Sequence, residues 1–269
     1  MMGADIAPYA DDLALMVEAS RMAADIGMSH FRKDPEVWYK NEGRSPVSEA
    51  DIAIDKLLKQ VLLKARPDYG WLSEELEDTE HRLADRRVFI VDPIDGTRAY
   101  VGGRPDWCVS VGLVEDGRPV AGVLAAPARG EVWKAHLGGG AFLNNDRLLA
   151  TDAVSGDRLR VAVPDIVAKE MRRGAKASLN KVAGGPSLAL RVAAVAQGEL
   201  DGVFVRPQAS EWDLAAADVM LAETGHVLVD RAGRRMLYNQ PDPSRGLLLA
   251  ASHRQVPDLL GLLQSPASH

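Results

Sequence analysis

Two carboxylates, a proline and a glycine follow a short apolar run in the segment Asp92-Pro93-Ile94-Asp95-Gly96-Thr97. The preceding residues, Val88–Val91, are apolar and mostly β-branched, which predicts a buried strand that ends at the first aspartate. Pro93 removes a backbone donor, and Gly96 allows a tight turn and a close approach to a bound group. The segment can therefore hold a hard metal ion beside backbone N–H groups that suit a phosphate. A surface turn fits the same residues, because Asp-Pro and Asp-Gly are common turn dipeptides.

Three further acids also lie next to predicted secondary structure, because each follows a short extended segment or opens a helix. They are Glu74 and Glu75, which follow Trp71-Leu72-Ser73, and Asp213, which ends Ser210-Glu211-Trp212-Asp213. Oxygen donors alone suit Mg²⁺ or Mn²⁺, whereas Zn²⁺ prefers thiolate or imidazole ligands. Taken alone, Asp213 is better explained as a helix cap, and the two glutamates as a solvated acidic pair. Only as a set do these acids indicate a metal site.

The bulk composition describes a globular chain of 269 residues, of which 46% are hydrophobic, with a net charge of −6. The acidic balance argues against partners such as a nucleic-acid polymer or a membrane surface. Cys108 is the single cysteine, which excludes an intramolecular disulfide and a cysteine-based zinc cluster. We see no signal-peptide pattern and no apolar run long enough to cross a bilayer, so we expect a cytoplasmic protein.

The spacing of apolar residues predicts helices and strands around these acids. Helices are expected at Pro8–Phe31, Ser48–Lys64, Ile166–Arg173, Ser187–Gln197, Glu211–Glu223 and Val256–Leu263. Strands are expected at Val88–Val91, Trp107–Val114, Val120–Ala126, Glu131–Ala135, Arg158–Val163, Gly202–Val205, His226–Val229 and Gly246–Ala251. The first four strands indicate an antiparallel meander. The change in pattern near residue 150 predicts an α+β subdomain over 1–150, with most of the metal ligands, and an α/β subdomain over 151–269, with Asp213 and substrate contacts.

Together these segments resemble the inositol monophosphatase superfamily of magnesium-dependent, lithium-sensitive phosphatases, over nearly the whole chain. The resemblance is carried by Ser45-Pro46-Val47-Ser48-Glu49-Ala50-Asp51, Leu72-Ser73-Glu74-Glu75, Asp92-Pro93-Ile94-Asp95-Gly96-Thr97, Gly185-Pro186-Ser187 and Trp212-Asp213. It implies the α+β fold of that superfamily, a layered αβαβα sandwich. It also implies a small-molecule phosphate ester as substrate and a homodimer as the assembly.

The resemblance further implies two or three Mg²⁺ ions per site, with Mn²⁺ as an alternative. Glu74, Asp92 and the carbonyl of Ile94 would bind the first ion. Asp92, Asp95 and Asp213 would bind the second, so that Asp92 bridges the two, and a third ion would lie near Glu74.

The same resemblance assigns the groups that act on the phosphate ester. Thr97, paired with Asp51, would orient or deprotonate the attacking water, next to the metal ligand Glu74. The N–H groups of Gly96 and Thr97 would hold the phosphate. Two cations would neutralise the phosphate dianion, lower the pKa of bound water and stabilise the leaving alkoxide.

The substrate is indicated by weaker features. Arg206 stands where inositol monophosphatases typically have a glutamate that contacts the inositol hydroxyls, and a guanidinium there suits a second phosphate. The predicted substrate contacts are Gly96, Thr97, Arg98, Gly185, Ser187 and Arg206. Arg98, Ser187 and the Leu72-Ser73 pair resemble the 3′(2′),5′-bisphosphate nucleotidase branch, which favours removal of the 3′-phosphate of adenosine 3′,5′-bisphosphate. The alternatives are a phosphatase of inositol 1-phosphate or another small polyol phosphate, and a non-catalytic relative that binds phosphorylated metabolites.

Overall fold

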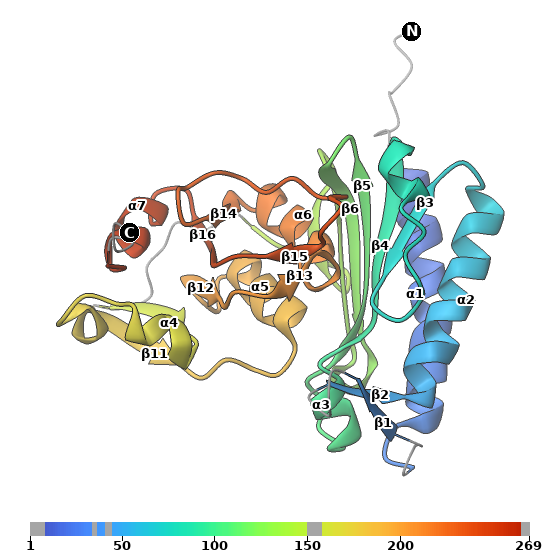
Figure 1. Ribbon diagram of the computed structural model, residues 1–269, viewed down its shortest axis with the longest axis horizontal. Helices are drawn as coiled ribbons and strands as arrows, with labels where there is room; N and C mark the ends of the chain where they lie inside the picture. The colour runs from blue at the N-terminus through green and yellow to red at the C-terminus, as the bar shows by residue number, and fades with distance from the viewer. Residues whose placement is uncertain (1–8, 34–36, 41–44, 150–157, 265–269) are drawn as a thin grey trace, which may run out of the picture.

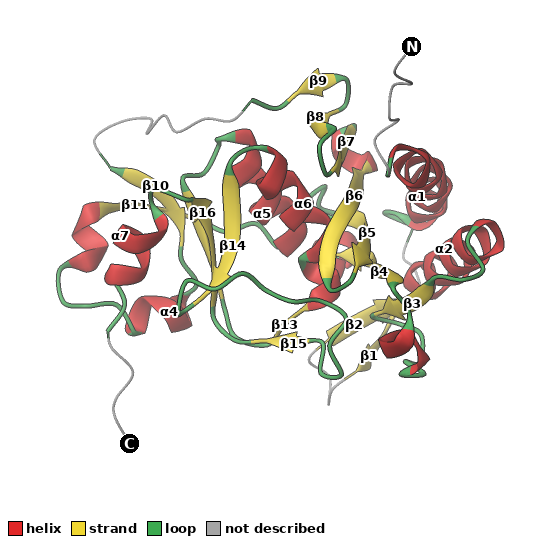
Figure 2. Cartoon of the chain, turned by 90° about the horizontal axis from the view of Figure 1, so that it is seen from above, coloured by secondary structure: helices red, strands yellow, loops and turns green. Residues whose placement is uncertain are grey.

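Helices and sheets alternate through the molecule in five layers, as the computed structural model shows in two views (Figures 1 and 2). The structure describes residues 9–33, 37–40, 45–149 and 158–264. From one side to the other, the layers are a helix pair, a sheet, a second helix pair, a second sheet and an outer helix layer. The expected αβαβα sandwich is therefore confirmed.

The first helix layer consists of α1 (Ala10–His30) and α2 (Glu49–Ala65), and both predicted helices are confirmed to within two residues. A two-stranded hairpin, β1 (Val37–Lys40) and β2 (Ser45–Ser48), connects them. Ser48 begins α2 through a capping box with Asp51. The apolar faces of α1 and α2 cover one face of the first sheet and form a continuous core with it.

The first sheet has seven strands in the order β3-β4-β5-β6-β7-β8-β9. The strands are β3 (Gly70–Ser73), β4 (Arg87–Asp95), β5 (Cys108–Glu115), β6 (Arg118–Ala126), β7 (Glu131–His136), β8 (Gly140–Leu143) and β9 (Asp146–Arg147). Only the β3–β4 pair is parallel, and the strands from β4 onward form an antiparallel meander. The predicted meander is confirmed.

Strand β4 continues through the acidic segment, whereas the sequence analysis ended it at Val91. Asp92 lies opposite Ser110, and Asp95 lies opposite Cys108, with a shift of register between the two pairs. The shift falls at Pro93, which cannot donate to the ladder. The two carboxylates therefore belong to the irregular end of a buried strand, and not to a separate turn.

The central helix layer lies between the two sheets and consists of α5 (Leu188–Gln197) and α6 (Ala215–Glu223). Helix α6 approaches the first sheet closely at Gly112 and Gly122, which face each other on β5 and β6. A Cβ atom at Gly122 would lie 2.8 Å from the Cα of Ala216, so only glycine allows this packing distance. Small residues on both partners thus set how near the start of α6, and Asp213 before it, comes to the end of β4.

The second sheet has five strands in the order β11-β10-β12-β16-β14. The strands are β10 (Leu159–Ala162), β11 (Leu179–Val182), β12 (Gly202–Val205), β14 (His226–Asp230) and β16 (Leu248–Ser252), and a separate ribbon pairs β13 (Ala209–Ser210) with β15 (Ser244–Arg245). Strands β10, β11 and β12 are parallel, so their carboxyl ends meet at one edge.

The outer layer holds α4 (Asp165–Lys169) and α7 (Val256–Gly261). The remaining short helices are α3 (Thr97–Val101), η1 (His81–Ala84), η2 (Pro127–Arg129), η3 (Ala175–Ser178) and η4 (Glu211–Asp213).

Two predicted helices differ from the structure. Helix α4 ends at Lys169 instead of Arg173, because Met171 bridges to Leu263 and the N–H of Arg172 donates to the carbonyl of Leu262. The predicted helix Glu211–Glu223 is divided at Leu214 into η4 and α6. The predicted subdomain division near residue 150 stays a prediction. One apolar core contains residues from both sides of it, because α5 and α6 pack between the sheets.

We predict that Gly122→Ala lowers the free energy of unfolding by about 1–3 kcal/mol, because the added methyl group must push α6 away from β6. The control is Gly246→Ala, where a Cβ meets nothing within 4 Å. Chemical denaturation of both variants measures the difference. Equal stability of the two variants would show that the Gly122–Ala216 contact does not constrain α6.

Candidate metal site

Three carboxylates from distant parts of the sequence meet at the end of β4. One oxygen each from Asp92, Asp95 and Asp213 lies within 4.8 Å of the other two. Asp92 and Asp95 are buried, and Asp213 is half-buried. These are the three acids that the resemblance assigns to the second metal ion. Oxygen ligands in this number and spacing suit a hard divalent cation.

The Asp95 carboxylate is held by the start of helix α5. The hydroxyl of Ser187 donates to it, and so do the backbone N–H groups of Leu188 at 3.2 Å and Ala189 at 2.7 Å. Ser187 also caps α5, because its Oγ accepts from the N–H of Leu190 at 3.1 Å. Burial raises the pKa of Asp95, and these hydrogen bonds act against the rise. The predicted substrate contact Ser187 is thus a partner of Asp95 in this structure.

Asp213 and Asp51 each cap a helical turn and still lie beside the acid cluster. The N–H of Ser210 donates to Oδ2 of Asp213 at 2.8 Å, and the N–H of Ser48 donates to Oδ2 of Asp51 at 2.8 Å. Burial is the largest cause that raises the pKa of both carboxyls to about 7. Capping and metal binding, which the sequence analysis treated as alternatives for Asp213, are compatible because capping occupies only one of the two oxygens.

Glu74 follows β3, next to β4, where its N–H donates to the carbonyl of Val91 at 3.2 Å. Burial raises the pKa of Asp92 well above its ordinary value, and the charge of Glu74 is the next largest cause, followed by those of Asp95 and Asp213. The charge of Glu74 therefore acts on Asp92, although Glu74 is not one of the three acids whose oxygens lie within 4.8 Å of one another. Its predicted roles as a ligand of the first metal ion and in catalysis stay predictions.

The turn after Asp95 is specific to glycine. Gly96 has a φ of 95°, and a Cβ there would lie 2.8 Å from the carbonyl oxygen of Asp106 and 3.3 Å from the Cβ of Ser187. It precedes α3, whose first N–H groups have no acceptor within the helix. The hydroxyl of Thr97 donates to the carbonyl of Ile94 at 2.9 Å. That carbonyl keeps a second lone pair, so it can still coordinate a cation.

The predicted pairing of Thr97 with Asp51 is not among the hydrogen bonds found in the part of the chain that the structure describes. Each group has another partner there: the Ile94 carbonyl for Thr97, and Ser48 for Asp51. The charge of Asp51 nevertheless raises the pKa of Asp92, which places Asp51 near the cluster. The Thr97–Asp51 pair stays a prediction.

A cavity of about 200 Å³ opens beside the acids, and its walls include Asp95, Asp213, Arg206 and Arg191. Arg206 is the one predicted basic contact among them. Arg98 is exposed on α3 and is not part of this wall, and Gly185 lines a neighbouring cavity of about 170 Å³.

The sequence analysis missed Arg191. It lies four residues after Ser187, and this spacing places both residues on one face of the predicted helix Ser187–Gln197. The sequence could therefore have indicated that Arg191 lies on the same helix face as the predicted substrate contact Ser187.

The residues present fit a divalent cation. The described acids offer oxygen donors only, they repel one another, and burial opposes their ionisation, as the raised pKa values of Asp92 and Asp213 show. A bound cation would offset both the repulsion and the cost of burying ionised carboxylates. We therefore treat the cluster of Asp92, Asp95 and Asp213 as the candidate metal site.

Comparisons with known proteins identify relatives of the chain. A sequence profile of the inositol monophosphatase family matches residues 10–264. The chain is 35% identical to an inositol-1-monophosphatase of Rhizobium meliloti (strain 1021), over 70% of this chain and 73% of that protein. It is 31% identical to a 3′(2′),5′-bisphosphate nucleotidase CysQ of Aggregatibacter actinomycetemcomitans, over 84% of this chain and 86% of that protein.

Solved structures agree with this likeness. The crystal structure of the extragenic suppressor protein SuhB from Bartonella henselae superimposes with a TM-score of 0.82 at 27% identity, over 95% of this chain and 99% of that chain. Among the described residues, the helices are too short or too polar for any of them to span a membrane.

We predict that saturating Mg²⁺ raises the melting temperature by about 5 °C or more, because a ligand at about 100 times its Kd adds about 2.7 kcal/mol to the folded state. Asp92→Asn should remove this response. Without Mg²⁺ the variant should melt no lower than the unchanged protein, since one buried negative charge is gone.

The matched control is Asp258→Asn, which alters an exposed acid on α7 and should keep the full response to Mg²⁺. Thermal melts with Mg²⁺ and with a chelator measure both variants. A full Mg²⁺ response in Asp92→Asn would contradict the assignment of the site.

Proposed function

Because the chain belongs to the inositol monophosphatase family, whose members are phosphatases, we propose that it is a magnesium-dependent phosphomonoesterase that uses water to release phosphate from a small-molecule ester. The observation that supports this most directly is the convergence of Asp92, Asp95 and Asp213 within 4.8 Å at the end of β4. Bound Mg²⁺ would neutralise the phosphate, lower the pKa of water and stabilise the leaving oxygen. Glu74, Asp92, the Ile94 carbonyl, Asp95 and Asp213 would hold the ions.

The chain's own groups would position the attacking water. The hydroxyl of Thr97 donates to the carbonyl of Ile94, which leaves its oxygen lone pairs to accept a hydrogen bond from water. Burial raises the pKa of Asp51 to about 7, and its charge acts on Asp92, which places its carboxylate beside the acid cluster. We propose that Thr97 orients the water and that Asp51 receives the proton.

The phosphate would bind at the turn between β4 and α3. The N–H groups of Gly96 and Thr97 stand at the start of α3, and the missing side chain of Gly96 allows a bound group to come close to the backbone. Three donors at the start of α5 hold the Asp95 carboxylate at the end of β4, next to this turn.

For the substrate, we propose the 3′-phosphate of adenosine 3′,5′-bisphosphate. Two arginines, Arg191 and Arg206, line the cavity beside the acids, and a second phosphate needs such cationic partners. The likeness to the bisphosphate nucleotidase of Aggregatibacter actinomycetemcomitans supports the same choice. The second candidate is inositol 1-phosphate, which the likeness to the inositol-1-monophosphatase of Rhizobium meliloti favours.

We predict that Asp213→Asn and Thr97→Ala each lower Mg²⁺-dependent phosphate release by at least about 100-fold without unfolding the protein. Thr97→Ser should recover most of the activity, since it restores the hydroxyl. The matched control is Asp218→Asn on α6, whose carboxylate accepts from Tyr238 instead of facing the site. Release of inorganic phosphate measures all four variants, and near-normal turnover by Asp213→Asn would refute the assignment.

We predict that adenosine 3′,5′-bisphosphate has a kcat/KM at least about tenfold above that of inositol 1-phosphate, because Arg191 and Arg206 can pair only with the former's second phosphate. The two esters are assayed in competition at one Mg²⁺ concentration. A preference for inositol 1-phosphate would replace our choice of substrate with the second candidate.

A further inference from the structure

Glu211, two residues before Asp213 of the candidate metal site, is a carboxylate without exposed surface. Three donors from one segment of the chain reach it. The N–H groups of Asn239 and Gln240 donate to it at 2.7 Å and 3.1 Å. The guanidinium of Arg245 donates to it as well, and the two side chains form an ion pair. This segment thus surrounds a buried negative charge at the edge of the metal site.

The same segment is held from its other side by Arg82, whose side chain is almost fully buried. Its guanidinium donates to Oδ1 of Asn239 at 2.7 Å and to the carbonyl of Gln240 at 3.1 Å. Nδ2 of Asn239 donates back to the carbonyl of Arg82 at 2.9 Å. Arg82 also forms an ion pair with Asp78 at 2.6 Å, in the chain between Glu74 and η1. The network therefore reaches the segment that carries a second predicted metal ligand.

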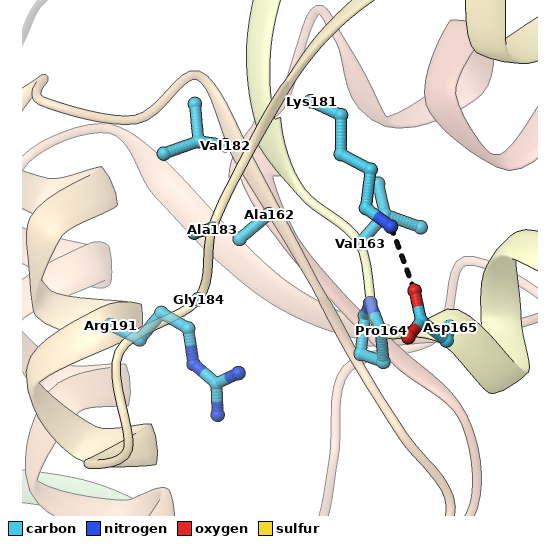
Figure 3. A pocket seen from close by; sticks show the side chains of 9 residues that line it. All are labelled: Ala162, Val163, Pro164, Asp165, Lys181, Val182, Ala183, Gly184 and Arg191. Atoms are coloured by element: carbon cyan, nitrogen blue, oxygen red, sulfur yellow. Dashed lines mark hydrogen bonds and ion pairs between the residues drawn. The ribbon is translucent and has the colours of Figure 1, made fainter.

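The charges of this network are withdrawn from water, in contrast to those of an exposed ion pair. Lys181 and Asp165 lie 2.9 Å apart (Figure 3), but their side chains are 48% and 93% exposed, so water screens the pair. The side chains of Arg245 and Glu211 are 14% and 0% exposed. Burial lowers the pKa of Arg245, and the charge of Arg82 lowers it further. Removing the negative partner would therefore leave positive charges buried without compensation.

The turn that carries Asp213 is also fixed from the first sheet. Ser110 of β5 lies opposite Asp92 of β4, and its hydroxyl donates to the carbonyl of Trp212 at 3.1 Å. Asp213 thus stands between two supports, the sheet on one side and the network around Glu211 on the other. Groups behind the ligands influence metal affinity, because they orient the carboxylates before a cation arrives.

We propose that Glu211 is a positioning residue, which holds the turn of Asp213 in place for metal binding. Asn239 and Arg82 extend this support to the chain that carries Glu74. The proposal rests on the phosphatase function proposed above, since it concerns the metal site of that function. The carboxylate of Glu211 bonds to the segment around Asn239 instead of joining the acid cluster, so it acts through Asp213.

Two variants interrupt the network at different points. Glu211→Gln keeps the size of the side chain but removes the charge that pairs with Arg245. Asn239→Gly removes the side-chain link to Arg82 and keeps the N–H that donates to Glu211. Glycine suits the φ of 58° at this position. The second variant decides the test if the first one does not fold.

The first readout follows the turn of Asp213 without a metal ion. The N–H of Ser210 donates to Oδ2 of Asp213 at 2.8 Å, so its hydrogen exchange reports whether the turn keeps its shape. In the metal-free protein we expect this exchange to be at least about tenfold faster in both variants, because the turn opens more easily once a supporting bond is lost. The N–H of Glu74, which donates to the carbonyl of Val91, should also exchange faster in Asn239→Gly.

The second readout is the Mg²⁺ concentration that gives half of the thermal stabilisation. Losing a group that orients a metal ligand typically costs about 10- to 100-fold in affinity, so this concentration should rise at least about tenfold in Glu211→Gln. The rise should be smaller in Asn239→Gly, which keeps the bonds to Glu211. At saturating Mg²⁺, phosphate release should largely recover, because Asp213 itself is unchanged.

The matched control is Asp201→Asn. Asp201 is a buried acid that pairs with Arg160 at 3.3 Å and accepts from the N–H of Arg160 at 2.6 Å. It precedes β12, at the opposite end of this strand from Arg206. The control should lose stability and keep both the exchange rate of Ser210 and the Mg²⁺ dependence of the unchanged protein.

A role of Glu211 in stability alone gives a different result. Both network variants would then melt at a lower temperature, as Asp201→Asn does, and keep the exchange of Ser210 and the response to Mg²⁺. That outcome would overturn the proposal. Absence of phosphate release in the unchanged protein would count against the proposed function alone, because neither hydrogen exchange nor Mg²⁺ binding needs turnover.

Discussion

The site depends on the hydrogen bonds between the Asp95 carboxylate and the start of helix α5. Asp95 ends a strand of the first sheet, and α5 packs against the second, so this contact joins residues that are 92 to 94 positions apart. The free N–H groups at the start of a helix suit a negative charge, which explains how a buried carboxylate is tolerated there. The same contact requires glycine at position 96, because a side chain there would collide with Ser187 and Asp106.

The cost of gathering negative charges in the interior governs the rest of the site. Burial raises the pKa values of Asp92, Asp95 and Asp213, and the charges of neighbouring acids raise those of Asp92 and Asp213 further, so without a cation the cluster would be an unfavourable part of the fold. Capping interactions reduce this cost, because Asp213 and Asp51 each accept a backbone hydrogen bond at a helical turn. Carboxylates held in place before a cation arrives lose little freedom when it binds, which favours tight coordination.

The wall of the site that would contact the leaving group is built differently from the acid cluster. It is formed at the carboxyl ends of β10, β11 and β12 and along α5, where parallel strands leave an open edge. Arg191 and Arg206 lie there, whereas Asp92 and Asp95 lie on β4. The side chains of this edge therefore come from other elements than Asp92 and Asp95. This separation gives a physical reason why relatives with one shared fold carry names of different phosphatases.

Much of the fold could be predicted from local patterns, because the periodicity of helices and the meander of strands depend on residues near one another in the chain. The acidic segment and its likeness to a known family also pointed to the three acids that the structure brings together.

Two- to four-residue strands such as β8, β9 and β15 were missed, since they are too short to show a pattern. The early end of α4 was missed because it follows from pairing with Leu262 and Leu263, over 90 residues away. Tertiary structure alone decided that Ser187 holds Asp95 and that Arg191 shares a cavity with Arg206. The sequence by itself determined which groups could do chemistry, and packing between the two sheets decided which of them meet, because burial and distance depend on the whole chain.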